Sequence, residues 1–339
     1  MKKLTLILMA FMVMTLSACY PSADGSKQEV AVQGRTMGTT YSVKVIGNPD
    51  RVAAINLKKQ IDELLVQINQ EMSTYIPDSE LSLVNKNTST GNIEISESLA
   101  VVVREAMRIG KISDGKLDVT VGPLVNLWGF GPEYRPETVP TDEVVNATRA
   151  QVGLDKLSLE GRQLTKGVPE LYIDLSTIAK GYGVDKVAEL VEQNGFHNYL
   201  VEIGGEMRLK GFKHTGELWH IAIEKPVSDE RSVHQVVVPR DNAVATSGNY
   251  RNYFEADGVR YSHIIDPDTA LPINHRLVSV TVVHPSSMTA DGLSTAMMVM
   301  GEKKAMAFAK KYDLAAYIIY KTDNGFVEES TESFMQYLK

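Results

Sequence analysis

The chain has 339 residues, of which 43% are hydrophobic and 23% are charged, and this balance excludes a disordered protein and a membrane protein with many spans. Its formal net charge of −7 at pH 7 makes nucleic acid an unsuitable partner, because nonspecific binding depends on basic side chains that meet phosphates. The length allows one large domain or two, with ample residues for a buried core.

The first 18 residues form a segment that resembles a bacterial lipoprotein signal. A basic start at Met1-Lys2-Lys3 precedes a short apolar run, and Leu16-Ser17-Ala18 leads to Cys19, the only cysteine. We expect cleavage before Cys19 and acyl chains on this cysteine, which anchor a soluble domain to a membrane surface. Loss of the two lysines then takes the formal charge from −7 to −9. The alternative is an ordinary secretory signal or a short membrane anchor.

Residues 19–29 are interpreted as a polar tether and residues 30–339 as one domain, because no repeat or composition break divides them. The mixture of helical and strand patterns favours an α+β fold, with a mixed, largely antiparallel sheet packed against helices. The strands expected between 219 and 266 are predicted to be neighbours in one antiparallel sheet. In chain order the pattern predicts a hairpin or bent strand at 30–45, helices at 53–72 and 97–112, strands at 116–121 and 171–175, a helix at 181–193, strands at 199–203, 219–224, 233–238, 243–247, 251–255, 261–266 and 278–284, helices at 289–300 and 302–312, and a closing strand at 314–321.

Polar residues in the segment 172–211 stand where apolar strands stop, and strand ends are frequent places for chemistry. The candidates in this segment are Asp174, Ser176, Lys180, Glu202 and Glu206.

Asp291 and Thr295 are four residues apart at the start of a predicted helix, so their side chains share one face. A carboxylate and a hydroxyl, together with carbonyl and phosphate oxygens, suit a hard cation such as Mg²⁺. The alternative is that Asp291 only caps the helix.

His263 lies near the end of a predicted strand, and it is either a structural or a catalytic histidine. The other histidines lack the spacing of zinc ligands, which argues against a zinc site. The segment 246–251 could hold a phosphate through hydroxyls, amides and Arg251, or it could be a polar turn. Tyr75 could stack on a planar ligand or pack at the end of a helix.

The sequence excludes a P-loop nucleotide site and disfavours a dinucleotide-binding site. No G-x-x-x-x-G-K-S/T loop occurs, and Lys186 stands where a dinucleotide fingerprint needs its third glycine.

Several segments together resemble the ApbE family of FAD:protein FMN transferases, and the resemblance extends over nearly the whole chain after the signal. They are GRTMGT (34–39), STY (73–75), DGKLDVTVGPLV (114–125), DLSTIAKGY (174–182), TSG (246–248), SHIIDP (262–267) and ADGLST (290–295).

The resemblance implies a T-fold-like α+β domain that cleaves FAD, releases AMP and joins FMN through a phosphoester to a Thr or Ser of a target protein. It also implies that Mg²⁺ is held by the Ala179 carbonyl and by the side chains of Asp291 and Thr295. Asp174, Glu202 and Glu206 are then expected to be structural groups or groups that support the residues lining the site. The positions that match the flavin site of the family are Met37, Tyr75, Lys116, Leu117, Asp118, Lys180 and His263.

For the reaction we expect Lys180 and Mg²⁺ to offset the charge of the diphosphate, and His263 and Asp291 to serve as catalytic residues. His263 would position or deprotonate the incoming hydroxyl, with Asp266 as its orienting partner. The implied location is the periplasmic side of a bacterial membrane, with the lipid anchor at Cys19. The implied targets are membrane subunits of the sodium-pumping NADH:quinone reductase and of Rnf complexes, which present a D-x-x-T/S-G-A-T/S motif. The alternatives are a pyrophosphatase that converts FAD to FMN and AMP, and a flavin-binding lipoprotein without catalysis.

Overall fold

The computed structural model describes residues 27–132, 139–225, 233–250, 252–256 and 258–339. The predicted signal, Cys19, most of the tether and Arg251 lie outside the described residues. Within these ranges, no helix is long and apolar enough to cross a membrane. The first strand begins at Gln28, slightly before the predicted domain boundary at residue 30.

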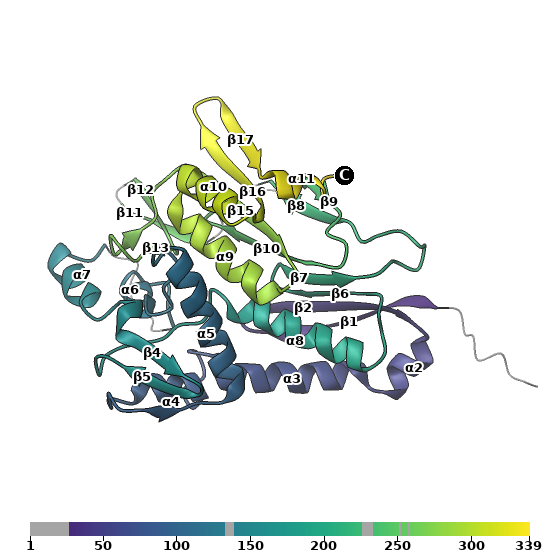
Figure 1. Cartoon of the computed structure of the whole chain (residues 1–339), viewed down its shortest axis with the longest axis horizontal. Coiled ribbons are helices and arrows are strands. Elements are labelled where there is room, and N and C mark those ends of the chain that lie inside the picture. Colours follow the sequence, from purple (N-terminus) through teal and green to yellow (C-terminus); the bar gives the residue numbers. More distant parts are fainter. Residues whose placement is uncertain (1–26, 133–138, 226–232, 251, 257) are drawn as a thin grey trace, which may run out of the picture.

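An eight-stranded sheet, in which all neighbouring strands are antiparallel, organises the fold (Figure 1). The predicted hairpin at its edge is confirmed, with Met37 and Gly38 as a two-residue turn in which both φ angles are positive, 49° and 71°. In spatial order the strands are β1 (Gln28–Thr36), β2 (Thr39–Gly47), β6 (Tyr199–Ile203), β7 (Glu206–Lys210), β10 (Ala243–Gly248), β15 (Leu277–His284), β16 (Ala315–Thr322) and β17 (Gly325–Ser330).

One face of this sheet is covered by amphipathic helices, whose apolar residues recur at helical spacing. Helices α3 (Leu57–Met72) and α8 (Ala179–Gln193) pack on β1, β2 and β6, where Tyr41 and Tyr199 are completely buried. Helices α5 (Glu97–Ile112), α9 (Ser287–Met300) and α10 (Glu302–Lys311) pack with the inner residues of β10, β15 and β16. The helices therefore bring α8 and α9 side by side at the centre of the sheet.

The opposite face is covered by a small hairpin, β8 (Ile221–Glu224) and β9 (Val233–Val237), and by α11 (Glu332–Met335). Phe334 is completely buried against Tyr317 and Ile319 of β16. This double cover explains why every residue of β15 except His284 is buried, because both faces of the strand are covered.

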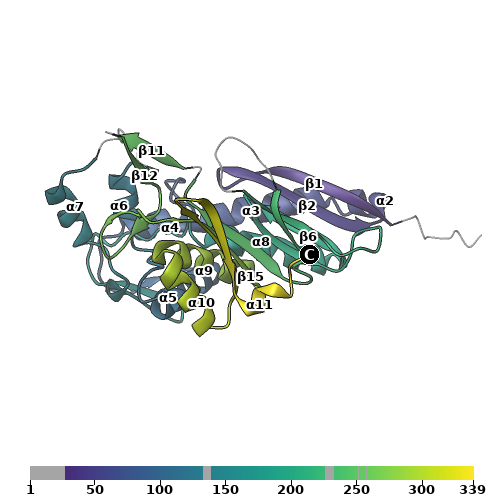
Figure 2. The same ribbon diagram turned by 90° about the horizontal axis from the view of Figure 1, so that it is seen from above.

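The remaining elements build one end of the molecule, where α6, α7, β11 and β12 lie opposite to β1 and α2 (Figure 1 and Figure 2). An aromatic cluster that includes Trp128, Phe254 and Tyr261 holds the hairpin of β11 and β12 against α6. Helix α2 (Pro49–Ala54) lies at the other end. The remaining elements are α4 (Glu80–Lys86), β3 (Ile93–Glu94), α6 (Gly122–Leu127), α7 (Asp142–Arg149), the 3₁₀ turn η1 (Leu154–Lys156), β4 (Leu157–Glu160), β5 (Gln163–Lys166), β11 (Tyr253–Ala256), β12 (Val259–Ser262), β13 (Ile265–Asp266) and β14 (Leu271–Pro272).

Two predicted strands are not strands. Residues 171–175 are extended and buried, but the backbone of Ile173 is paired by a side chain, since the Asn85 amide both donates to its carbonyl and accepts from its N–H, at 2.8 Å each. Residues 116–121 form turns, because the Asp118 carboxylate accepts from the N–H of Thr120 at 2.7 Å and draws the chain into a bend.

The single sheet expected between 219 and 266 is also wrong. Its strands are divided among the hairpin β8–β9, the large sheet through β10, the hairpin β11–β12 and the pair β13–β14. The chain does not close at 314–321 either, because β17 follows as the edge strand of the sheet and α11 then covers part of the second face.

Candidate functional site

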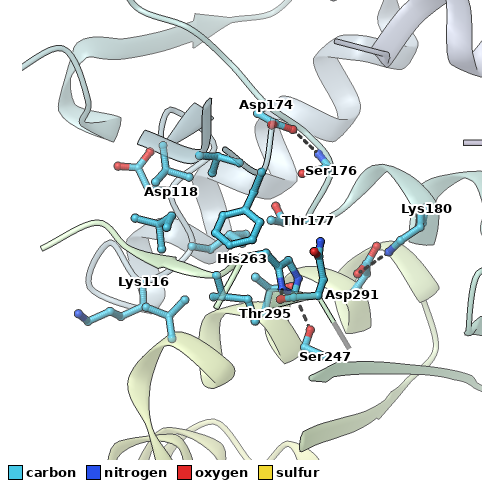
Figure 3. A pocket seen from close by; sticks show the side chains of 18 of the residues that line it. Lys116, Asp118, Asp174, Ser176, Thr177, Lys180, Ser247, His263, Asp291 and Thr295 are labelled. Carbon is cyan, nitrogen blue, oxygen red and sulfur yellow. Dashed lines mark hydrogen bonds and ion pairs between the residues drawn. The ribbon is translucent and has the colours of Figure 1, made fainter. Parts of the chain in front are cut away.

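A cavity of about 350 Å³ opens where α8 and α9 meet loops from the rest of the chain (Figure 3). A second cavity of about 720 Å³ adjoins it, with Tyr75, Asp174 and Lys180 among the residues that line both. Together they form an elongated cleft, which suits a ligand with two distinct ends. All the predicted catalytic, flavin and metal residues line this cleft: Lys116, Leu117, Asp118, His263, Asp291 and Thr295 in the first cavity, Met37 and Ala179 in the second, and Tyr75 and Lys180 in both.

Lys180, in the first turn of α8, lies between two buried carboxylates. Its Nζ is 2.9 Å from Oε1 of Glu206 on β7 and 3.7 Å from Oδ1 of Asp291 on α9. Burial alone would lower the pKa of Lys180, but Asp291 and Glu206 outweigh it and raise this pKa, so the ammonium stays charged. Burial raises the pKa of Asp291 to about 7, an effect that Lys180 opposes and Glu206 increases. With one cation for two acids, the cluster favours the arrival of a further positive charge.

Asp291 and Thr295 share one face of α9, as their spacing predicts, and both line the first cavity. The alternative that Asp291 caps the helix is wrong, because the cap is Ser286, whose Oγ accepts from the N–H of Thr289 at 3.2 Å. Asp291 instead accepts from the N–H of Gly181 at 3.0 Å, across 110 residues of sequence. The carboxylate thus joins the start of α8 to the second turn of α9.

His263 lies in the first cavity, and its ring is oriented by the backbone. Its Nδ1 is 3.0 Å from the carbonyl oxygen of Asn252. Because a carbonyl only accepts, Nδ1 carries the proton in the neutral ring and Nε2 keeps a free lone pair. Burial lowers the pKa of His263 from its ordinary value, the Asn252 contact opposes this, and nearby Lys180 lowers the pKa further. The expected orienting partner Asp266 bonds to Lys116 instead.

Lys116 and Asp118 line the first cavity, but their charged groups bind other residues of the chain. The Nζ of Lys116 is 2.8 Å from Asp266 and 2.7 Å from Asp268, and Figure 3 shows its ammonium directed away from the centre of the cavity. The Asp118 carboxylate accepts from both the N–H and the hydroxyl of Thr120. Lys116 therefore fastens the turn that follows His263 to the turn at 114–118.

Tyr75 and Met37 belong to the mouth and wall of the second cavity. The Tyr75 side chain is 67% exposed although it lines both cavities, so its ring is free to meet a planar ligand. Met37 is placed by the turn between β1 and β2, and it packs near Gly183 of α8. Leu117 is only 1% exposed and belongs to the core, so it forms part of the cavity floor.

Two polar atoms in the first cavity were not assigned a role from the sequence. Within the part of the chain that the structure describes, Glu206 Oε2 and Thr177 Oγ1 are buried without a hydrogen-bond partner. Glu206 was a candidate because it begins a strand after two glycines, whereas Thr177 carried no signal beyond its place in the segment 174–182. Buried atoms without a partner are unusual in proteins, and here both belong to residues that line the first cavity.

The oxygen donors in this cleft fit Mg²⁺ better than a softer metal. The described residues contain no group of three or more His, Cys, Asp or Glu side chains that could hold a metal ion. The carboxylate of Asp291, the hydroxyl of Thr295 and the carbonyl of Ala179 are instead a small set of hard donors. Mg²⁺ is commonly bound in this way, with waters and substrate phosphates completing its coordination.

Comparisons with known proteins find one family in both sequence and structure. The model of the ApbE family matches residues 37–318. The chain is 54% identical to an FAD:protein FMN transferase from Vibrio cholerae, with 96% of each chain covered, and 48% identical to one from Haemophilus influenzae, with 98% of each covered. It also superposes on the crystal structure of Pseudomonas stutzeri flavinyl transferase ApbE in its apo form, with a TM-score of 0.84, 39% identity and coverage of 92% of this chain and 97% of that one. The flavin transferase ApbE from Vibrio cholerae gives a TM-score of 0.87 and 54% identity, with coverage of 92% of this chain and 100% of that one.

Proposed function

This chain belongs to the ApbE family, and we propose that it is an FAD:protein FMN transferase that uses Mg²⁺ to join FMN through a phosphoester bond to a Thr or Ser hydroxyl of a target protein. The observation that carries this proposal is the meeting of Lys180, Asp291, Thr295 and a neutral His263 in one cleft. Elongated FAD fits the two adjoining cavities, with the flavin ring beside Tyr75 and Met37.

The charge of the diphosphate is the first obstacle in an acidic protein, and this cluster supplies the means to offset it. Asp291, Thr295 and the Ala179 carbonyl would hold Mg²⁺, which when bound polarises the phosphorus under attack and neutralises charge. Lys180 adds a fixed ammonium, kept charged and in place by Glu206. The protein thus contributes alignment and charge stabilisation, which are the main requirements of phosphoryl transfer.

His263 then acts on the acceptor hydroxyl. The lone pair on Nε2 accepts the hydroxyl proton while the oxygen forms a bond to the phosphorus on the FMN side of the diphosphate. The bond from this phosphorus to the bridging oxygen breaks, and AMP leaves with that oxygen. The Asn252 carbonyl keeps the ring in the tautomer that this step needs, because it accepts a hydrogen bond from the Nδ1–H group throughout.

The proposed targets come from the resemblance to the family, and the proposed location comes from the lipoprotein-like signal before Cys19. We assign as targets the membrane subunits of the sodium-pumping NADH:quinone reductase and of Rnf complexes, through a D-x-x-T/S-G-A-T/S motif. Lipid anchoring at Cys19 supports a position on the periplasmic side of the membrane, close to such subunits.

The test is to incubate the purified protein with FAD, Mg²⁺ and a peptide that carries the motif. We expect a fluorescent peptide whose mass increases by one FMN residue, with equimolar AMP, and no product from a peptide in which the acceptor Thr is replaced by Ala. Free FMN that forms at the same rate with and without peptide would indicate an FAD pyrophosphatase. Bound flavin without any AMP would indicate a carrier.

A further inference from the structure

Asp185 is a buried carboxylate on α8 that binds the beginning of α9. Asp185 is only 7% exposed to solvent. Oδ1 accepts from the N–H of Ser287 at 3.0 Å, and Oδ2 accepts from the N–H of Met288 at 3.0 Å and from the hydroxyl of Ser286 at 2.7 Å. Arg208 on β7 donates to Oδ1 at 3.0 Å and balances the charge. Both oxygens of Asp185 are therefore occupied by the protein.

These bonds do more than begin the helix. The first N–H groups of a helix lack partners within it, and they attract a negative charge. Ser286 already serves as the local cap of α9, through its bond from Thr289. Asp185 adds partners for the N–H groups of Ser287 and Met288 from a different helix, so its bonds fix where α9 begins relative to α8.

The place of this contact matters because the two helices carry the two halves of the site. One turn before Asp185, Gly181 packs so closely on α9 that a Cβ there would lie 2.4 Å from the Ser287 carbonyl oxygen. The N–H of Gly181 also donates to Asp291. The helix pair is thus fastened at two points, by Asp185 at the start of α9 and by Gly181 near Asp291.

We propose that Asp185 is a positioning residue, which holds α9 in register with α8 so that Asp291 and Thr295 face the Ala179 carbonyl and Lys180. The proposal rests on the proposed function, since it concerns the affinity of the same site for its divalent cation. Groups that orient the residues around a metal commonly change its affinity by about 10-fold to 100-fold when they are removed.

Glu192 offers a matched control on the same helix. It pairs with Lys210 at 3.2 Å and with Arg208 at 4.0 Å, and it accepts from the Tyr199 hydroxyl at 2.6 Å. These partners lie on β6 and β7, and none of them belongs to α9. Asp185→Asn and Glu192→Gln therefore each remove one buried or half-buried charge that is bound to Arg208, but only the first disturbs the contact between the helices.

The experiment titrates Mn²⁺ into the whole mature protein in the presence of saturating FAD and measures bound metal by electron paramagnetic resonance, alongside thermal melting. We expect Asp185→Asn to raise the Kd for Mn²⁺ at least tenfold and Glu192→Gln to change it less than twofold, whatever the two melting temperatures are. An equal change in both variants, or no change in folded Asp185→Asn, would overturn the proposal.

A second variant covers the case in which Asp185→Asn does not fold. Ser286→Ala removes one bond to Asp185 together with the cap bond from Thr289. It should raise the Kd for Mn²⁺ by about threefold or more. An unchanged Kd would again overturn the proposal. Failure of the proposed function is distinguishable, because the wild-type protein would then bind no Mn²⁺ with FAD and release no AMP.

Discussion

The close contact between Gly181 and α9 makes Gly181→Ala a sensitive test of how the site is built. A methyl group at this position would lie 2.4 Å from the Ser287 carbonyl oxygen and 2.7 Å from the Cα of Met288. Both are backbone atoms, so no side-chain rotation relieves the contact. Because nonbonded atoms settle at about 3.5 Å, α9 must move away from α8 by roughly 1 Å.

The energetic cost follows from two opposing effects. Overpacking of this kind costs about 1–3 kcal/mol, and the better helix propensity of Ala over Gly returns about 1 kcal/mol. We expect a net loss of about 0–2 kcal/mol in the free energy of unfolding, measured by urea denaturation. The same movement lengthens the 3.0 Å bond from the Gly181 N–H to Asp291, so the Mg²⁺ concentration for half-maximal AMP release should rise about tenfold.

Gly183→Ala is the control for helix propensity. Its nearest neighbour is the terminal methyl of Met37 at 3.1 Å, which is flexible and can move. We expect this variant to be as stable as the wild type or slightly more stable. If Gly181→Ala matches it in stability and keeps the normal Mg²⁺ response, the reasoning about the contact between α8 and α9 is refuted.

Three further predictions concern individual side chains. Asp291→Ala should abolish AMP release and flavin transfer at every Mg²⁺ concentration, because it removes the one carboxylate among the expected metal ligands, and intact transfer would contradict that role. Burial lowers the pKa of His263, so its neutral, basic form persists below the usual histidine range. At saturating Mg²⁺, kcat should therefore fall only as the pH decreases through this lowered pKa. In His263→Gln this decrease of kcat at acid pH should be absent. Lys116→Met leaves Asp266 and Asp268 without their shared cation and should lower the free energy of unfolding in urea by about 1–2 kcal/mol. The loss is smaller than for a fully buried ion pair, because the Asp268 side chain is 65% exposed. An unchanged midpoint of urea denaturation would show that these ion pairs do not fasten the turn.

Local sequence signals predicted the longer helices well, but they did not predict the short helices α2, α4, α6, α7 and α11. The bounds of α5 agree with the expected 97–112, because Ser96 caps its start and the apolar residues keep helical spacing up to the turn at Ser113. Strands were predicted less reliably when their partners are remote. The run at 171–175 has the composition of a buried strand, yet the groups that pair with Ile173 belong to the side chain of Asn85, which no local pattern reveals.

The candidate site was likewise predicted where local sequence signals suffice and missed where remote contacts decide. The spacing of Asp291 and Thr295 correctly placed them on one face of a helix, but it did not decide between a ligand and a cap, which depended on where α9 begins. The partner of His263 was wrongly expected to be Asp266, its neighbour in sequence, whereas the structure uses the carbonyl of Asn252. Glu206 was expected to be a structural or supporting group. Only the three-dimensional arrangement shows that its Oε1 atom pairs with the ammonium group of Lys180.

The bond between Gly181 and Asp291 also bears on when the protein becomes active during its synthesis. These residues are 110 positions apart, and Thr295 lies further still towards the C-terminus. A nascent chain that ends before α9 has Lys180 but none of the side chains expected to bind the cation. A form truncated before α9 therefore lacks both side chains expected to bind the cation, and the site is complete only when α9 has packed against α8.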